Sequence, residues 1–121
     1  SRMKTLKNSV WLGCVGWFYS LLVGASPLEN HSNEQLLTNF ALASCIATFY
    51  PKTEVAKDAK VAMQGYVEFS DLSIEVFAGI HELIDRKAVE QYQAKRGGTV
   101  ELAYCIDFSH SEQVQRLTTS D

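Results

Sequence analysis

Apolar side chains recur at helical spacing along nearly the whole chain after Ser32, and this pattern limits the chain to a helical fold. Ser32 with Gln35 three residues later forms a capping box, which opens a helix, and Pro51 ends the helix that follows. No two stretches show the strict alternation of strands, and the sequence contains no Asn-Gly hairpin signal. We therefore predict an all-α fold, one compact domain of four to five helices.

Caps and breakers place the next helix boundaries. Thr53 is expected to cap a second helix, and the cap-rich segment 70–73 is expected to open the longest helix, which runs to about Ala94. On the solvent side of that helix Glu82 precedes Arg86 by four residues, the orientation that stabilises a helix. The prediction is one long, continuous helix in this part of the chain.

A pair of glycines follows this expected helix. Gly97 and Gly98 supply the φ > 0 freedom that a helix C-cap requires, and the charges of Lys95 and Arg96 suit the last turn of a helix. The pair lacks the glycine spacing and the Lys-Ser/Thr of a phosphate-binding loop. We predict a helix end here.

Two short helices are expected after the glycines. Thr99 is expected to cap the first, and Ser109 with Glu112 forms a second capping box that opens the last helix. The segment 99–108 also fits a strand. A lone strand would have no partner in this fold, so a helix is favoured.

The N-terminal segment has the three-part pattern of a secretory signal peptide. Basic residues begin it, fourteen uncharged residues follow over 10–23, and small residues precede a cleavage point after Ala25. The uncharged run is shorter than the ~20 residues that span a bilayer. We predict a leader over residues 1–25, headed by a Ser1-Arg2 cloning remnant, and one helical domain over residues 26–121.

Two other interpretations of this segment stay open. Leu12-Gly13-Cys14 is a fragment of a lipobox, but Trp11 stands where a Leu is wanted and the apolar run continues past the cysteine. Alternatively, residues 9–24 form a first, buried helix of the domain. The placement of the charges favours the leader.

Removal of the leader leaves an even pair of cysteines, Cys45 and Cys105. In an oxidising compartment such a pair in a small domain is most simply a disulfide. The bridge would close a loop of about 60 residues and would stabilise the domain by ~4 kcal/mol in the chain-entropy model. The alternative is two buried thiols that pack as small apolar side chains. We predict the bridge.

The domain is acidic once the leader is set aside. The whole chain carries 11 Lys and Arg against 14 Asp and Glu. Three of the basic residues and none of the acidic ones lie in the leader, which leaves eight against fourteen, or −6. This charge is a poor fit to nucleic acid or to an anionic membrane, and it fits a protein partner with a basic surface better.

The polar residues give little support for catalysis or for a metal site. A Cys–His–Asp hydrolase would have to use Cys105 with His110 or His81. Asp107 lies only two residues from that cysteine, on another helical face, and a disulfide would remove the nucleophile. The histidines, including His31, are scattered without H-x-x-x-H spacing. We predict a binding protein with no metal and no other cofactor.

Four segments of the domain have an order and spacing found together in one known family. They are Leu42-Ala43-Ser44-Cys45-Ile46-Ala47 followed by Tyr50-Pro51, Gly65-Tyr66-Val67-Glu68-Phe69-Ser70-Asp71, Gly97-Gly98, and Cys105-Ile106-Asp107-Phe108-Ser109-His110-Ser111. With the leader, they make the chain resemble the type VI secretion amidase immunity proteins. These are small periplasmic proteins that protect a bacterium from a peptidoglycan-cleaving amidase delivered by its kin.

This resemblance implies an all-helical, homodimeric and non-catalytic protein in the periplasm. It implies a partner, a Cys–His amidase whose substrate groove the protein plugs, and it places the family's paired cysteines on Cys45 and Cys105. It also implies that a protruding loop and neighbouring helix ends contact this effector. The segment 93–99 is the first candidate for the loop, and the acidic turn 68–73 is the second.

The candidate effector-binding residues are therefore Gln93, Lys95, Arg96, Gly97, Gly98 and Thr99 in the first segment, and Glu68 and Asp71 in the second. Either segment alone can also be an ordinary solvated loop. The competing function from another class is a periplasmic adaptor or chaperone-like helical protein with a peptide-binding groove.

Overall fold

A computed structural model describes residues 27–119 of the chain, so the predicted leader over 1–25 and the alternative helix at 9–24 lie outside the described residues. Two short 3-10 helices, labelled η, accompany the α-helices. In chain order the elements are η1 (Pro27–Asn30), α2 (Asn33–Phe49), α3 (Glu54–Phe69), α4 (Ile74–Leu83), η2 (Ala88–Gln91), α5 (Glu101–Ser109) and α6 (Glu112–Thr119). No strand is formed within residues 27–119, and the predicted all-α fold is confirmed.

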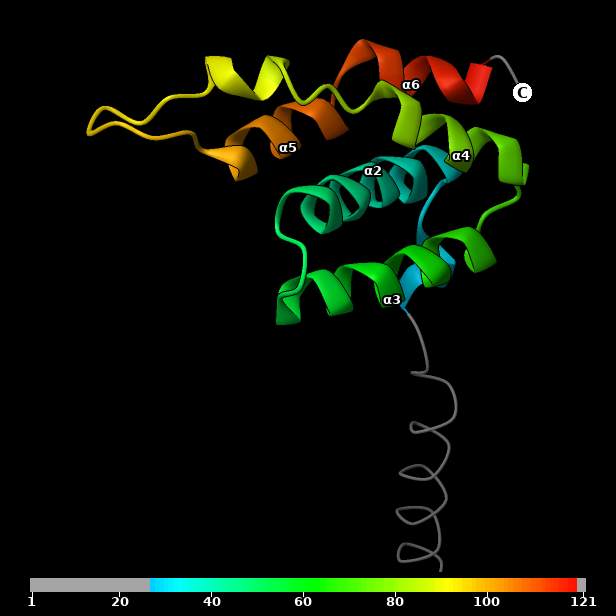
Figure 1. Cartoon of the computed structure of the whole chain (residues 1–121). Helices are drawn as coiled ribbons and strands as arrows, with labels where there is room; N and C mark the ends of the chain where they lie inside the picture. Colours follow the sequence, from blue (N-terminus) through cyan, green and yellow to red (C-terminus); the bar gives the residue numbers. More distant parts are fainter. Residues whose placement is uncertain (1–26, 120–121) are drawn as a thin grey trace, which may run out of the picture.

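Helix α2 lies at the centre of the fold and contacts each of the helices α3 to α6 (Figure 1). The capping box that opens it is present: the Ser32 hydroxyl accepts from the Gln35 N–H (3.1 Å), and the Gln35 side chain accepts from the Ser32 N–H (2.7 Å). Buried residues occur around the helix instead of along one stripe, as in a helix covered on several sides. They are Leu36, Leu37, Phe40, Ala41, Ala43, Ser44 and Cys45.

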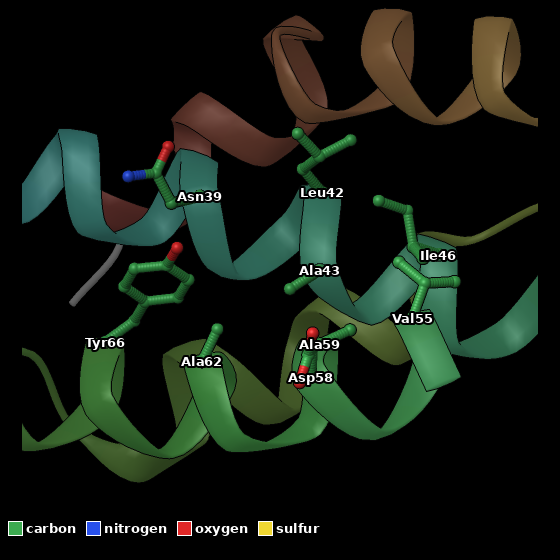
Figure 2. A pocket seen from close by; sticks show the side chains of 9 residues that line it. All are labelled: Asn39, Leu42, Ala43, Ile46, Val55, Asp58, Ala59, Ala62 and Tyr66. Atoms are coloured by element: carbon green, nitrogen blue, oxygen red, sulfur yellow. The ribbon is translucent and has the colours of Figure 1, made fainter. Parts of the chain in front are cut away.

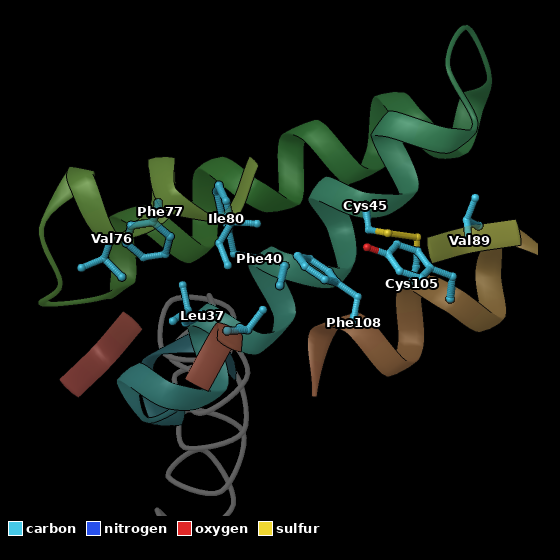
Figure 3. Close-up of a cluster of buried hydrophobic side chains, with 12 residues drawn as sticks. Leu37, Phe40, Cys45, Val76, Phe77, Ile80, Val89, Cys105 and Phe108 are labelled. Carbon is cyan, nitrogen blue, oxygen red and sulfur yellow. A yellow bond between two sulfur atoms is a disulfide. The ribbon is translucent and has the colours of Figure 1, made fainter. Parts of the chain in front are cut away.

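The hydrophobic core joins α2 to α4, α5 and α6 (Figure 3). Phe40 of α2 meets Phe77 of α4 edge to face, with ring centroids 4.9 Å apart. Ile80 from α4 and Val114 from α6 are fully buried in the same cluster. Helix α3 packs along the other side of α2 and begins as predicted, because the Thr53 hydroxyl accepts from the Ala56 N–H (3.2 Å).

The prediction of one long helix to about Ala94 is wrong, because α4 already ends at Leu83. Ile84 takes an extended conformation (φ −66°, ψ 121°), and the Asp85 N–H donates to the Tyr104 hydroxyl of α5 (2.8 Å) instead of continuing a helix. The Asp85 carboxylate then accepts from the N–H groups of the next turn. A tertiary contact and an Asx turn therefore replace the helix here.

The i,i+4 pair predicted for this helix is absent for the same reason. Glu82 and Arg86 form no ion pair in the described structure, since the helix ends between them. The Arg86 guanidinium carbon instead lies 5.5 Å from the centre of the Phe49 ring at the end of α2.

The last two helices form, but their predicted caps are wrong. Helix α5 follows Val100, and the Thr99 hydroxyl accepts from the Gln93 side chain (3.2 Å) instead of capping it. The Ser109 hydroxyl donates to a carbonyl within α5, while Ser111 accepts from the Val114 N–H (3.3 Å) and so caps α6. The segment 99–108 is helical over most of its length, which excludes the strand interpretation.

Candidate functional site

The predicted disulfide is present and joins α2 to α5 (Figure 3). The Cα atoms of Cys45 and Cys105 are 5.5 Å apart, and both residues are fully buried. Because its sulfur is bonded, Cys105 cannot act as a thiolate nucleophile, and the hydrolase arrangement considered from the sequence is excluded. The bridge instead fixes α5 on the central helix.

Residues 93–99 form a short hairpin that projects from one end of the molecule, at the left of Figure 1. An isolated antiparallel bridge pairs Gln93 with Thr99, and within it the Ala94 N–H donates to the Gly98 carbonyl (2.9 Å). Gly97 and Gly98 have φ of +97° and +90°, so the predicted need for φ > 0 is confirmed. The two glycines turn a hairpin, however, and do not cap a helix.

The hairpin tip is positively charged. Lys95 and Arg96 were expected in the last turn of a helix, but with α4 ending earlier they lie at this tip instead. Both are exposed, and neither makes an ion pair within residues 27–119. The nearest acidic residues along the chain are Glu90 and Glu101, outside the hairpin. An otherwise acidic domain therefore carries a cationic projection.

Tyr92 and Val100 stand at the base of the hairpin, where the Val100 N–H donates to the Tyr92 carbonyl (2.7 Å). The Tyr92 hydroxyl donates to the Asp107 carboxylate of α5 (2.9 Å), and this bond, with the nearby negative charge, raises the pKa of Tyr92. The pairing of Tyr92 with Asp107 was not predicted. A long helix ending near residue 94 gives no reason to bring the two together.

The second candidate segment lies elsewhere. Glu68 is in the last turn of α3 and Asp71 is in the α3–α4 connection, and both are exposed. The Asp71 N–H donates to the Asn33 side chain (3.0 Å), which holds the connection against the start of α2. This turn is at the right of Figure 1, at the opposite end of the molecule from the hairpin. The fold does not bring the two candidate segments together.

A shallow apolar groove of about 260 Å³ runs between α2 and α3 (Figure 2). Leu42 and Ile46 line it from α2, and Val55, half of whose surface is exposed, lines it from α3. Two further exposed apolar side chains, Leu102 and Ile106, lie one helical turn apart on α5, the helix that packs against the other side of α2. These five residues are here called the apolar face.

The histidines have structural surroundings. His81 Nδ1 lies 3.2 Å from the buried Ser44 hydroxyl, and its ring meets Phe40 edge to face. His31 and His110 line a second shallow pocket beside the start of α2. Among residues 27–119, no three His, Cys, Asp or Glu side chains gather as metal ligands, and no helix there is long and apolar enough to cross a membrane.

The fold is that of a small, disulfide-bridged helical protein with a projecting hairpin. The model of the Tai4 family, described as type VI secretion system (T6SS), amidase immunity protein, matches residues 35–118, and the chain belongs to this family. No curated protein matches the sequence. Members of the family are inhibitors and not enzymes, and membership implies a cognate amidase effector as partner.

Proposed function

We propose that this protein binds the active-site groove of its cognate type VI peptidoglycan amidase and blocks it with the 93–99 hairpin. The observation that carries the proposal is a projecting loop with a preformed turn and two unpaired cations, on a protein of an amidase immunity family. A loop that is already ordered loses little conformational entropy on binding. The peptide-binding adaptor considered from the sequence has no comparable support.

The charge of the hairpin specifies the partner surface. Lys95 and Arg96 would be repelled by a basic groove and attracted by an acidic one. The overall charge of the domain favoured a basic partner surface, but the groove meets the tip and not the whole domain. The groove that receives the hairpin is therefore acidic, and Glu68 and Asp71 are a secondary candidate contact at the other end.

The proposed inhibition of a wall-cleaving enzyme requires this protein to be in the periplasm. The leader pattern over residues 1–25 supports export and cleavage after Ala25. The buried disulfide supports an oxidising compartment, because buried structural bridges persist there and are rare in the cytosol. Mass spectrometry of the exported protein tests this assignment: a mature N-terminus at Ser26 supports it, and retention of residues 1–25 contradicts it.

The protein acts as a homodimer in this proposal. The apolar face supports it, because exposed apolar side chains on both α3 and α5, with a groove between α2 and α3, are typical of surfaces that another protein covers. Sedimentation of the purified mature protein is expected to give a dimer, and Ile106→Asp a monomer. Val61→Asp, at an exposed apolar position of α3 outside the apolar face, is the matched control and leaves the dimer intact. A monomeric wild type contradicts the homodimer.

The central experiment is capture of an amidase from the periplasm followed by an inhibition assay. The wild type is expected to abolish peptidoglycan cleavage at equimolar ratio. Lys95→Ala/Arg96→Ala is expected to inhibit about thirtyfold less well, while its thermal unfolding midpoint stays unchanged. Lys57→Ala/Lys60→Ala removes two exposed cations from α3 and is the matched control.

Two outcomes contradict the proposal at different levels. Failure of the wild type to inhibit any type VI amidase contradicts the blocking function itself. Full inhibition by the Lys95→Ala/Arg96→Ala variant removes the hairpin tip from the interface and leaves the segment with Glu68 and Asp71 as the site to test.

A further inference from the structure

The backbone hydrogen bonds within the hairpin tip fix its local shape, but they do not fix the direction in which it points. Within the described chain, the backbone hydrogen bonds of residues 94–98 join these residues only to one another, as in the bond from the Gly97 N–H to the Ala94 carbonyl (2.9 Å). All five residues are exposed. The direction in which the tip points must therefore be set at the base of the hairpin.

One arm of the hairpin continues from Val100 directly into α5, so its direction follows that of the helix. The disulfide at Cys105 fixes α5 on α2. The position of this arm therefore does not depend on any side chain of the hairpin.

The other arm arrives from η2 and is attached to α5 through Tyr92. Its hydroxyl donates to Asp107 (2.9 Å), and its ring meets the Tyr104 ring edge to face at a centroid distance of 5.7 Å. Asp107 follows Tyr104 by three residues and so lies beside it on the helix surface. Tyr92 therefore contacts α5 at two neighbouring points: its ring packs on Tyr104, and its hydroxyl donates to the carboxylate of Asp107.

We propose that Tyr92 and Asp107 are positioning residues for effector binding: their hydrogen bond holds the hairpin at the angle at which its tip enters the amidase groove. The inference rests on the proposed blocking function. Neither residue needs to touch the amidase. The bond is exposed, while the bodies of η2 and α5 are held by the buried Val89 and by the disulfide. Its loss therefore changes the direction of the hairpin more than the stability of the domain.

The test compares Tyr92→Phe with Asp107→Ala and Asp107→Asn. Tyr92→Phe keeps the ring on Tyr104 and removes only the donor, and Asp107→Asn keeps an acceptor oxygen. With an amidase that the wild type inhibits, chosen from a panel of purified type VI amidases, Tyr92→Phe and Asp107→Ala are each expected to weaken binding about tenfold. Asp107→Asn is expected to recover most of this loss.

Three readouts separate positioning from a merely structural role. The double variant Tyr92→Phe/Asp107→Ala is expected to bind no worse than either single variant, because both remove the same bond. The thermal midpoint is expected to stay near that of the wild type. Amide exchange at Val100, measured without any amidase, is expected to accelerate, since its acceptor is the Tyr92 carbonyl. Tyr66→Phe, in α3, is the matched control. It is expected to leave amidase binding, the thermal midpoint and amide exchange at Val100 unchanged.

Unchanged binding by Tyr92→Phe overturns the inference, and so do additive losses in the double variant. Unchanged exchange at Val100 overturns it even before an amidase is found. These results are distinct from failure of the proposed function, in which the wild type itself inhibits none of the amidases.

Discussion

The 93–99 hairpin and the 68–73 turn were both candidates for contact with an effector, and they are held in different ways. In the turn, the Ser70 hydroxyl accepts from the Leu72 N–H (3.2 Å), Asn33 accepts from the Asp71 N–H, and Leu72 packs against the core. Its shape therefore follows from the packing of α2, α3 and α4. The hairpin tip is shaped by local bonds, and its base depends on α5 and the disulfide.

This difference indicates which of the two segments can change its surface side chains with little loss of folding stability. The backbone of the turn is fixed by Leu72 against the core and by the bond from the Asp71 N–H to Asn33. The hairpin tip has no such constraint, because residues 94–98 are all exposed. The following predictions test this contrast, from the largest expected effect to the smallest.

Removal of the disulfide is expected to have the largest effect. Cys45→Ala/Cys105→Ala deletes a link between residues 60 apart and should lower the free energy of unfolding by about 4 kcal/mol, as measured by urea denaturation. Amide exchange should accelerate more at α5 and the hairpin base than in the 68–73 turn. A loss below about 1 kcal/mol, or equal acceleration in both regions, would contradict the contrast.

Charge reversal is expected to separate the two segments by affinity. Lys95→Glu/Arg96→Glu should weaken binding of the cognate amidase by about a hundredfold, because it opposes an acidic groove with like charge. Glu68→Lys/Asp71→Lys, the matched reversal, should change affinity by no more than about threefold. Calorimetric titration measures both, and a larger effect at the turn would reverse our assignment of the site.

Backbone strain at the hairpin tip is expected to reduce affinity without unfolding the body. A Cβ at Gly98 meets nothing within 4 Å, but φ of +90° strains an L-residue by about 1–2 kcal/mol. Gly98→Ala should therefore distort the tip, lower the thermal midpoint by no more than about 10 °C and weaken amidase binding about tenfold. Gly65→Ala, within α3, is the control: it gains up to ~1 kcal/mol of helix propensity and meets only the tip of Leu28 at 3.3 Å. An unfolded Gly98→Ala protein would show that the tip supports the body.

The smallest expected effect is on ionisation. The bond to Asp107 and its negative charge raise the pKa of Tyr92 above the ordinary 10.0, so the bond is present from neutral pH up to about 10 and is lost as the pH rises through the raised pKa. Absorbance titration with Tyr92→Phe as reference isolates this residue from Tyr104, whose pKa burial also raises. Asp107→Asn should move the Tyr92 pKa back toward its ordinary value, and an unmoved pKa would argue against the bond.

Local signals predicted the body of the fold well. The Ser32–Gln35 box and the Thr53 cap fix the starts of α2 and α3, and the spare cysteine pair predicted the bridge. Each of these signals depends on residues close in sequence or on a simple count. They work because capping is a local hydrogen bond between a side chain and the next turn.

The end of α4 at Leu83 could not be predicted in this way. The segment 80–94 contains neither glycine nor proline, and its helix propensity is high. The helix ends because the Asp85 N–H bonds to Tyr104 and because Val89 is buried in the core, and both contacts come from the tertiary fold. Residues 94–98 are exposed, but that they contact an effector stays a prediction, and their arrangement in a hairpin was not predicted.

The early end of α4 has a consequence for how this protein can diverge. It releases the tip from packing, so residues 94–98 form an exchangeable insert between two fixed anchors, Tyr92 and Val100. Under the proposed function, we expect that replacing the insert with that of a relative changes what the protein recognises while the folded body stays the same. New specificities can therefore accumulate here without drawing on the limited stability of a small domain.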